Sequence, residues 1–120
     1  MTLRLNIAEE FSPVPVGRYR TDGDKSGEVF REECLYPKIR DAMKKQTILI
    51  VDFTGMYGLS SSFLEEAFGG LVREKGLNSA DILRVLRFRP EESYFDLYID
   101  LTKGYINKAK PARTKTEHYA

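Results

Sequence analysis

The feature that most constrains the fold is a short apolar run followed by a helical pattern of apolar residues. Residues 47–53 read Thr-Ile-Leu-Ile-Val-Asp-Phe, which is typical of a central strand buried on both faces, in a sheet covered by helices. Apolar residues then recur with the period of one helix face, at Phe63, Leu64, Ala67, Phe68, Leu71 and Val72. A buried strand leading into an amphipathic helix indicates an α/β protein.

The pattern continues on both sides of this unit. Apolar and polar residues alternate over 3–7 and again over 82–89, so both segments are predicted strands. Ser26 is a predicted helix cap, and Pro37 either interrupts that helix or starts a second one. Residues 91–108 have mostly helical spacing.

The alternation of strands and helices predicts one domain, over residues 1–109. Its expected fold class is α/β, a mixed β-sheet with helices packed on it. Residues 110–120 are expected to form a basic, flexible tail. Gly76 is predicted to end the helix that carries the apolar stripe. Gly69 and Gly70, inside that helix, predict close approach of another backbone.

Composition argues against most catalytic chemistry. The chain has one cysteine, Cys34, and one histidine, His118 in the predicted tail, which is too few for a four-ligand zinc site. No phosphate loop or dinucleotide fingerprint is present. We therefore predict a protein that is not an enzyme and needs no cofactor. The single cysteine, with no signal-peptide pattern or membrane-length apolar run, predicts a cytoplasmic location.

The turn between the buried strand and the helix is the first candidate site. It reads Phe-Thr-Gly-Met-Tyr-Gly-Leu-Ser-Ser-Ser over residues 53–62. Met56, Tyr57 and Leu59 are apolar residues in a predicted loop, where a protein partner can bury them. We therefore predict that these three residues bind a partner.

Three serines lead from this turn into the helix. Ser62 and Glu65 have capping-box spacing, so Ser62 is predicted to cap the helix. A helix N-terminus favours negative charge, so phosphorylation of Ser60 or Ser61 would be tolerated there and would change the surface charge. The alternative is that Ser60 and Ser61 only fill the turn.

Calcium binding is a second hypothesis, because one segment has the spacing of an EF-hand loop. The ligands would be Asp22, Asp24, Ser26, Glu28 and Glu33. The same residues also fit a polar turn followed by a helix capped by Ser26, and the preceding prolines argue against the entering helix that an EF-hand needs.

Two basic features suggest further partners. Arg18, beside Gly17, is a candidate for binding a carboxylate or phosphate of a partner. From Lys103 onward the chain carries a net charge of +4, against −3 for the residues before it. This basic end suggests a nucleic-acid accessory protein as another alternative, although a solvated end explains it equally well.

Several motifs together resemble a known family. They are Phe11-Ser with Gly17-Arg18, residues 26–32 (Ser-Gly-Glu-Val-Phe-Arg-Glu), Ile50-Val-Asp-Phe, and residues 61–71 (Ser-Ser-Phe-Leu-Glu-Glu-Ala-Phe-Gly-Gly-Leu). The chain resembles the STAS-like domains of the DUF4325 family over about residues 11–109, and the run over 62–71 is the most specific part.

That family is in turn similar to the STAS domains of anti-sigma-factor antagonists. The resemblance implies a mixed sheet with helices on it and a regulatory role in binding proteins. In the antagonists a histidine-kinase-like ATPase phosphorylates a serine between a central strand and the next helix, a position that falls on Ser60 or Ser61. The antagonists have an aspartate directly before that serine, whereas Leu59 precedes Ser60 here.

Overall fold

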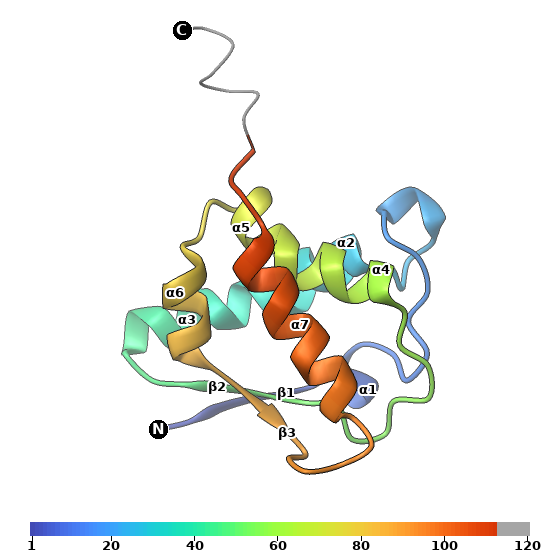
Figure 1. Cartoon of the computed structure of the whole chain (residues 1–120), viewed down its shortest axis with the longest axis horizontal. Coiled ribbons are helices and arrows are strands. Elements are labelled where there is room, and N and C mark those ends of the chain that lie inside the picture. Colours follow the sequence, from blue (N-terminus) through green and yellow to red (C-terminus); the bar gives the residue numbers. More distant parts are fainter. Residues whose placement is uncertain (113–120) are drawn as a thin grey trace, which may run out of the picture.

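The computed structural model describes residues 1–112 and consists of a small sheet with helices packed against it (Figure 1). The strands are β1 (Leu3–Asn6), β2 (Leu49–Asp52) and β3 (Leu86–Arg89). The helices are α1 (Ile7–Glu10), α2 (Gly27–Phe30), α3 (Tyr36–Lys45), α4 (Ser61–Leu64), α5 (Gly70–Arg73), α6 (Ser79–Val85) and α7 (Asp96–Lys108). The α/β class is confirmed.

The sheet of the described chain has the order β1-β2-β3, and both pairs are parallel. The prediction of a mixed sheet was therefore wrong in this respect. Helices occupy the connection between each strand and the next, and such a crossover returns the chain to the same end of the sheet. β2 is the central strand, as predicted.

The helices lie on one side of the sheet (Figure 1). Leu5, Val51 and Phe88 align across the three strands and are buried toward the helices. Arg4 and Arg87 flank Ile50 in the strand register on the opposite face. Ile50 is nevertheless only 9% exposed. Burial of β2 on both faces is thus confirmed, although the outer face lacks a covering helix within residues 1–112.

One helix runs from α4 to α5 through a π-helical segment at Glu65–Gly69. All six residues of its apolar stripe are buried, as predicted. Gly76 ends it with a φ of 72°. The Gly76 amide donates to the Val72 carbonyl, four residues earlier, which is the hydrogen bond of the αL helix cap. The Leu77 amide also donates, to the Leu71 carbonyl.

A second helix runs from α2 to α3 through another π-helical segment, Arg31–Leu35. Ser26 caps it as predicted, because its hydroxyl accepts a hydrogen bond from the Val29 amide at 3.2 Å. Pro37 lies in the first turn of α3. Because Leu35 and Tyr36 before it are also helical, the proline neither interrupts the helix nor starts a separate one; it follows the π-helical segment within one continuous helix.

The predicted strand over 82–89 is only half right. Its first half is the end of helix α6, and only Leu86–Arg89 is a strand. Asn78 starts the helix, because its side chain accepts a hydrogen bond from the Asp81 amide at 3.1 Å. Ile82 and Val85 are buried on one helix face, so a spacing of three residues was mistaken for alternation.

Candidate functional site

The turn from β2 to α4 is held in place by its backbone. The Met56 amide donates to the Phe53 carbonyl at 3.0 Å, and the Tyr57 amide donates to the Pro13 carbonyl at 2.8 Å. Met56 itself is 6% exposed and belongs to the hydrophobic core. The prediction that Met56 contacts a partner was therefore wrong, because its side chain anchors the turn from inside.

Anchoring Met56 leaves the next side chain outside. Tyr57 is 82% exposed, while Leu59 is half-buried against the core. Val14 follows Pro13, which holds the Tyr57 amide, and is itself exposed. The loop that contains Val14 and the turn that contains Tyr57 lie side by side on the right of Figure 1. The sequence did not predict the hydrogen bond between Tyr57 and Pro13, because the two residues are far apart in the chain.

The three serines have different environments. Ser60 is the helix cap: its hydroxyl accepts a hydrogen bond from the Phe63 amide at 3.1 Å. The prediction that Ser62 caps the helix was wrong, because the helix begins two residues earlier and Ser62 lies inside its first turn. Ser62 lies 3.3 Å from Ser60, between hydroxyl oxygens. Ser61 is the first helical residue and is exposed.

We expect Ser60→Ala to lower the free energy of unfolding by about 1 kcal/mol, the usual cost of losing a helix cap. Ser61→Ala should change it by less than about 0.5 kcal/mol, because Ser61 is exposed and does not cap the helix. Urea unfolding of the two variants beside the wild type measures both values. Equal destabilisation by the two substitutions would contradict this assignment of the cap.

Arg18 does not present a free guanidinium to solvent. Its Nη1 lies 2.5 Å from a carboxylate oxygen of Glu65 and 3.3 Å from one of Glu66. The prediction that Arg18 binds a partner's anion is corrected accordingly: its anions are two carboxylates of this chain. These ion pairs attach the loop before α2 to the helix that follows the turn.

Glu66 and Arg31 form the buried centre of this network. Their side chains are 5% and 4% exposed, and Arg31 Nη1 lies 2.8 Å from both a carboxylate oxygen and the backbone carbonyl of Glu66. Arg73 reaches Glu66 at 3.2 Å and Glu65 at 2.8 Å. Burial alone would raise the pKa of Glu65, but hydrogen bonds from Arg73 and Arg18 outweigh it and lower that pKa.

The residues of the calcium hypothesis have other partners. Asp22 accepts hydrogen bonds from the backbone of Arg18 and Tyr19, and Ser26 caps its helix. Glu33 pairs with Arg20 at 3.4 Å. Asp24 and Glu28 do not join them in a ligand set, since residues 1–112 contain no group of three or more metal-binding side chains. The calcium hypothesis is therefore not supported.

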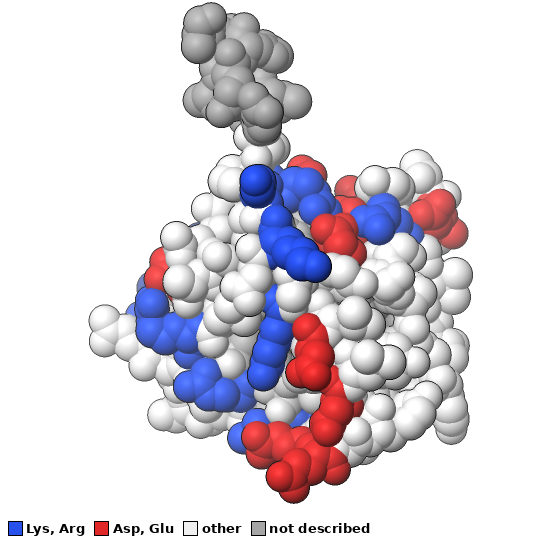
Figure 2. All heavy atoms as spheres, viewed as in Figure 1, with Lys and Arg blue, Asp and Glu red and all other residues white. Residues whose placement is uncertain are grey.

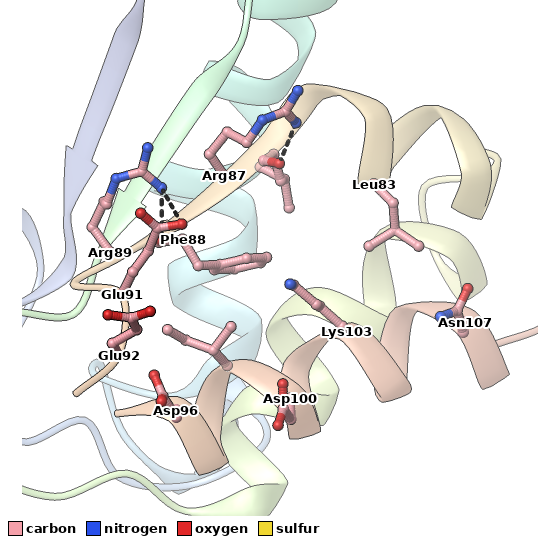
Figure 3. Close-up of a pocket in the computed structure, with 12 residues that line it drawn as sticks. Leu83, Arg87, Phe88, Arg89, Glu91, Glu92, Asp96, Asp100, Lys103 and Asn107 are labelled. Atoms are coloured by element: carbon pink, nitrogen blue, oxygen red, sulfur yellow. Dashed lines mark hydrogen bonds and ion pairs between the residues drawn. The ribbon is translucent and has the colours of Figure 1, made fainter. Parts of the chain in front are cut away.

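A groove of about 560 Å³ lies away from this turn, between the edge strand β3 and helix α7 (Figure 3). Arg87 and Arg89 project from the strand, while Asp96, Asp100 and Lys103 project from the helix. The groove thus contains charged groups but no histidine or cysteine. The sequence did not predict it, because its two walls are joined by a turn whose direction local patterns do not specify.

Three further features named in the sequence analysis are the single cysteine, the membrane-spanning potential and the basic tail. Cys34 is half-buried, and burial together with the nearby Glu33 and Glu10 carboxylates raises the pKa of its thiol, which lowers its reactivity. Within residues 1–112, every helix is too short or too polar to cross a membrane. His118 and most of the predicted basic tail, on which the nucleic-acid hypothesis rests, lie outside the described residues.

The matched family model is described as a STAS-like domain of unknown function (DUF4325), and it covers residues 26–92, more than half of the chain. The chain belongs to this STAS-like family. The match extends from the Ser26 cap through β2 and the turn to β3. Neither the curated proteins nor the solved structures contain a significant match to the chain.

Proposed function

We propose that this STAS-like domain is a non-catalytic module that regulates a process by binding a protein partner through the turn before α4. The observation that carries the proposal is Tyr57, an aromatic side chain that is 82% exposed on a turn fixed by backbone hydrogen bonds. Exposed tyrosines on rigid backbone are favourable anchors, because they bury much surface at a low cost in side-chain entropy.

The proposed partner surface consists of Val14, Tyr57, Leu59 and Ser61. Val14 adds a second exposed apolar side chain, on the loop whose Pro13 carbonyl accepts from the Tyr57 amide, and Leu59 is half-buried against the core. A surface of this kind has an apolar centre that a partner can desolvate.

We further propose Ser61 as the switch, with phosphorylation by a histidine-kinase-like ATPase as the resemblance to anti-sigma-factor antagonists implies. Ser60 is engaged as the helix cap, whereas Ser61 is exposed at the first helical position. A phosphate on Ser61 would add nearly two negative charges four residues after Tyr57 without removing the cap. Partner binding would then change while the fold stays intact.

Affinity capture from the native cells tests this proposal. We expect Tyr57→Ala to lose a partner that the wild type retains, and Ser61→Asp to change the set of retained proteins, including a histidine-kinase-like ATPase. Tyr94→Ala is the matched control, because Tyr94 is also a highly exposed tyrosine but lies near α7. Identical partners for wild type, Tyr57→Ala and Ser61→Asp, with all proteins folded, would reject both the surface and the switch.

A further inference from the structure

Strand β3 is an edge of the sheet, yet its own arginines occupy the outward side. Arg89 directs its carbonyl inward, where it accepts from the Phe53 amide, so the carbonyls of Leu86 and Phe88 point outward. Arg87 Nη1 donates a hydrogen bond to the Leu86 carbonyl at 2.8 Å, and Arg89 Nη1 donates one to the Phe88 carbonyl at 2.9 Å (Figure 3). The two arginines thus occupy the outward carbonyls of their own strand. Charged side chains on an edge oppose the addition of another strand.

The neighbouring helix α7, in contrast, has a partly exposed apolar face that no helix or strand of residues 1–112 covers. Ile99, Thr102 and Ile106 are buried toward the core. On the opposite side, at helical spacing, a shallow depression of about 210 Å³ is lined by Leu97, Leu101, Gly104 and Tyr105, with Asp100 and Lys108 beside them. Leu97 is 63% exposed. We call Leu97, Leu101, Gly104 and Tyr105 the α7 stripe.

Charge along α7 is divided between its two ends. The acidic residues Asp96 and Asp100 lie in the N-terminal half, and Lys103 and Lys108 lie in the C-terminal half. Figure 2 shows the same division on this face of the molecule, with acidic and basic side chains gathered in separate zones. Glu91 and Glu92 extend the acidic end in the groove beside it.

A surface that is acidic at one end and basic at the other is complementary to a copy of itself rotated by 180°. Such a rotation makes two helices antiparallel and places the acidic end of each against the basic end of the other. It also opposes the two helix dipoles favourably. At Gly104, an added Cβ would meet no described atom within 4 Å, so the helix of a second copy has room to approach closely there.

We propose that the α7 stripe binds a second copy of this chain, as an antiparallel pair of α7 helices around a two-fold axis. Asp100 of each copy then faces Lys108 of the other. This surface uses none of the residues of the proposed partner surface. A helix of 13 residues offers a contact only about 20 Å long, less than a tight dimer needs, so the dissociation constant is micromolar or weaker.

Charge reversal tests the pair in the full chain by analytical ultracentrifugation. Wild type should form dimers as its concentration rises into the millimolar range. Asp100→Lys and Lys108→Asp should each weaken self-association by about tenfold or more, because like charges then face each other twice. Mixing the two variants should restore dimers, since both contacts in the mixed pair join opposite charges.

The matched control is Lys44→Asp, a charge reversal on α3 that should leave self-association unchanged. Circular dichroism of every variant keeps loss of folding separate from loss of dimers. The proposal is overturned if wild type stays monomeric at millimolar concentration. Variants that dimerise as tightly as the wild type, or a mixture that stays as weak as its components, would also overturn it.

Discussion

Arg31→Ala should lower the free energy of unfolding by about 3–5 kcal/mol, the usual cost of removing one member of a buried ion pair. The substitution would leave the Glu66 carboxylate buried without its closest cation, 2.8 Å away. It would also remove the donor to the Glu66 carbonyl. Guanidinium chloride unfolding measures the change, and a loss below about 1 kcal/mol would contradict this account of the network.

Two further variants distinguish the loss of charge compensation at Glu66 from the loss of packing. Arg31→Met combined with Glu66→Leu removes both charges and should be much less destabilising than Arg31→Ala, because the buried carboxylate is removed together with its closest cation. Arg20→Ala breaks an exposed pair with Glu33 and should cost less than about 1 kcal/mol. If the double variant is as unstable as Arg31→Ala, the ion pair contributes to the free energy of unfolding through side-chain packing rather than through charge compensation.

The elements predicted correctly from the sequence were those that local periodicity determines. The apolar stripe from Phe63 to Val72 and the central strand followed from the spacing of apolar residues, since one buried face imposes one period. The strand over 82–89 was mispredicted because two buried residues three apart, Ile82 and Val85, fit a helix face as well as an irregular alternation.

The candidate site was predicted less completely, because contacts distant in sequence decide it. The turn itself and the exposure of Tyr57 agree with the sequence pattern. Met56 has the same apolar character, yet it is buried, and only the path of the backbone distinguishes the two. Arg18 finds its carboxylates 47 and 48 residues away, a distance at which local pattern carries no information.

The glycine that permits the closest helix contact was also not the one predicted. Gly69 and Gly70 were expected to admit another backbone, and at Gly69 an added Cβ would indeed lie 3.5 Å from the Tyr105 carbonyl oxygen of α7. A Cβ at Gly70 would instead collide with the Arg31 guanidinium, so this glycine makes room for a side chain. Gly27, in the first turn of α2, is where two backbones meet: an added Cβ would lie 2.7 Å from the Phe63 carbonyl oxygen and 3.3 Å from the Ala67 amide nitrogen.

Gly27→Ala should therefore destabilise the protein by about 2–3 kcal/mol, as overpacking of a core contact does. Helix propensity alone predicts the opposite sign, because alanine favours a helix over glycine by about 1 kcal/mol. The steric term is expected to win, since the obstructing atoms at Phe63 and Ala67 are backbone and cannot change rotamer. The helix that contains them would have to shift, and it begins at the proposed partner surface.

Gly104→Ala is the matched control, since Gly104 is also helical but an added Cβ there meets open space. At concentrations where the chain is monomeric, this substitution should raise the free energy of unfolding by up to about 1 kcal/mol. Opposite signs for the two variants in urea unfolding would locate the tight helix contact at Gly27. If Gly27→Ala is stabilising as well, α2 and α4 must be far enough apart to admit a methyl group.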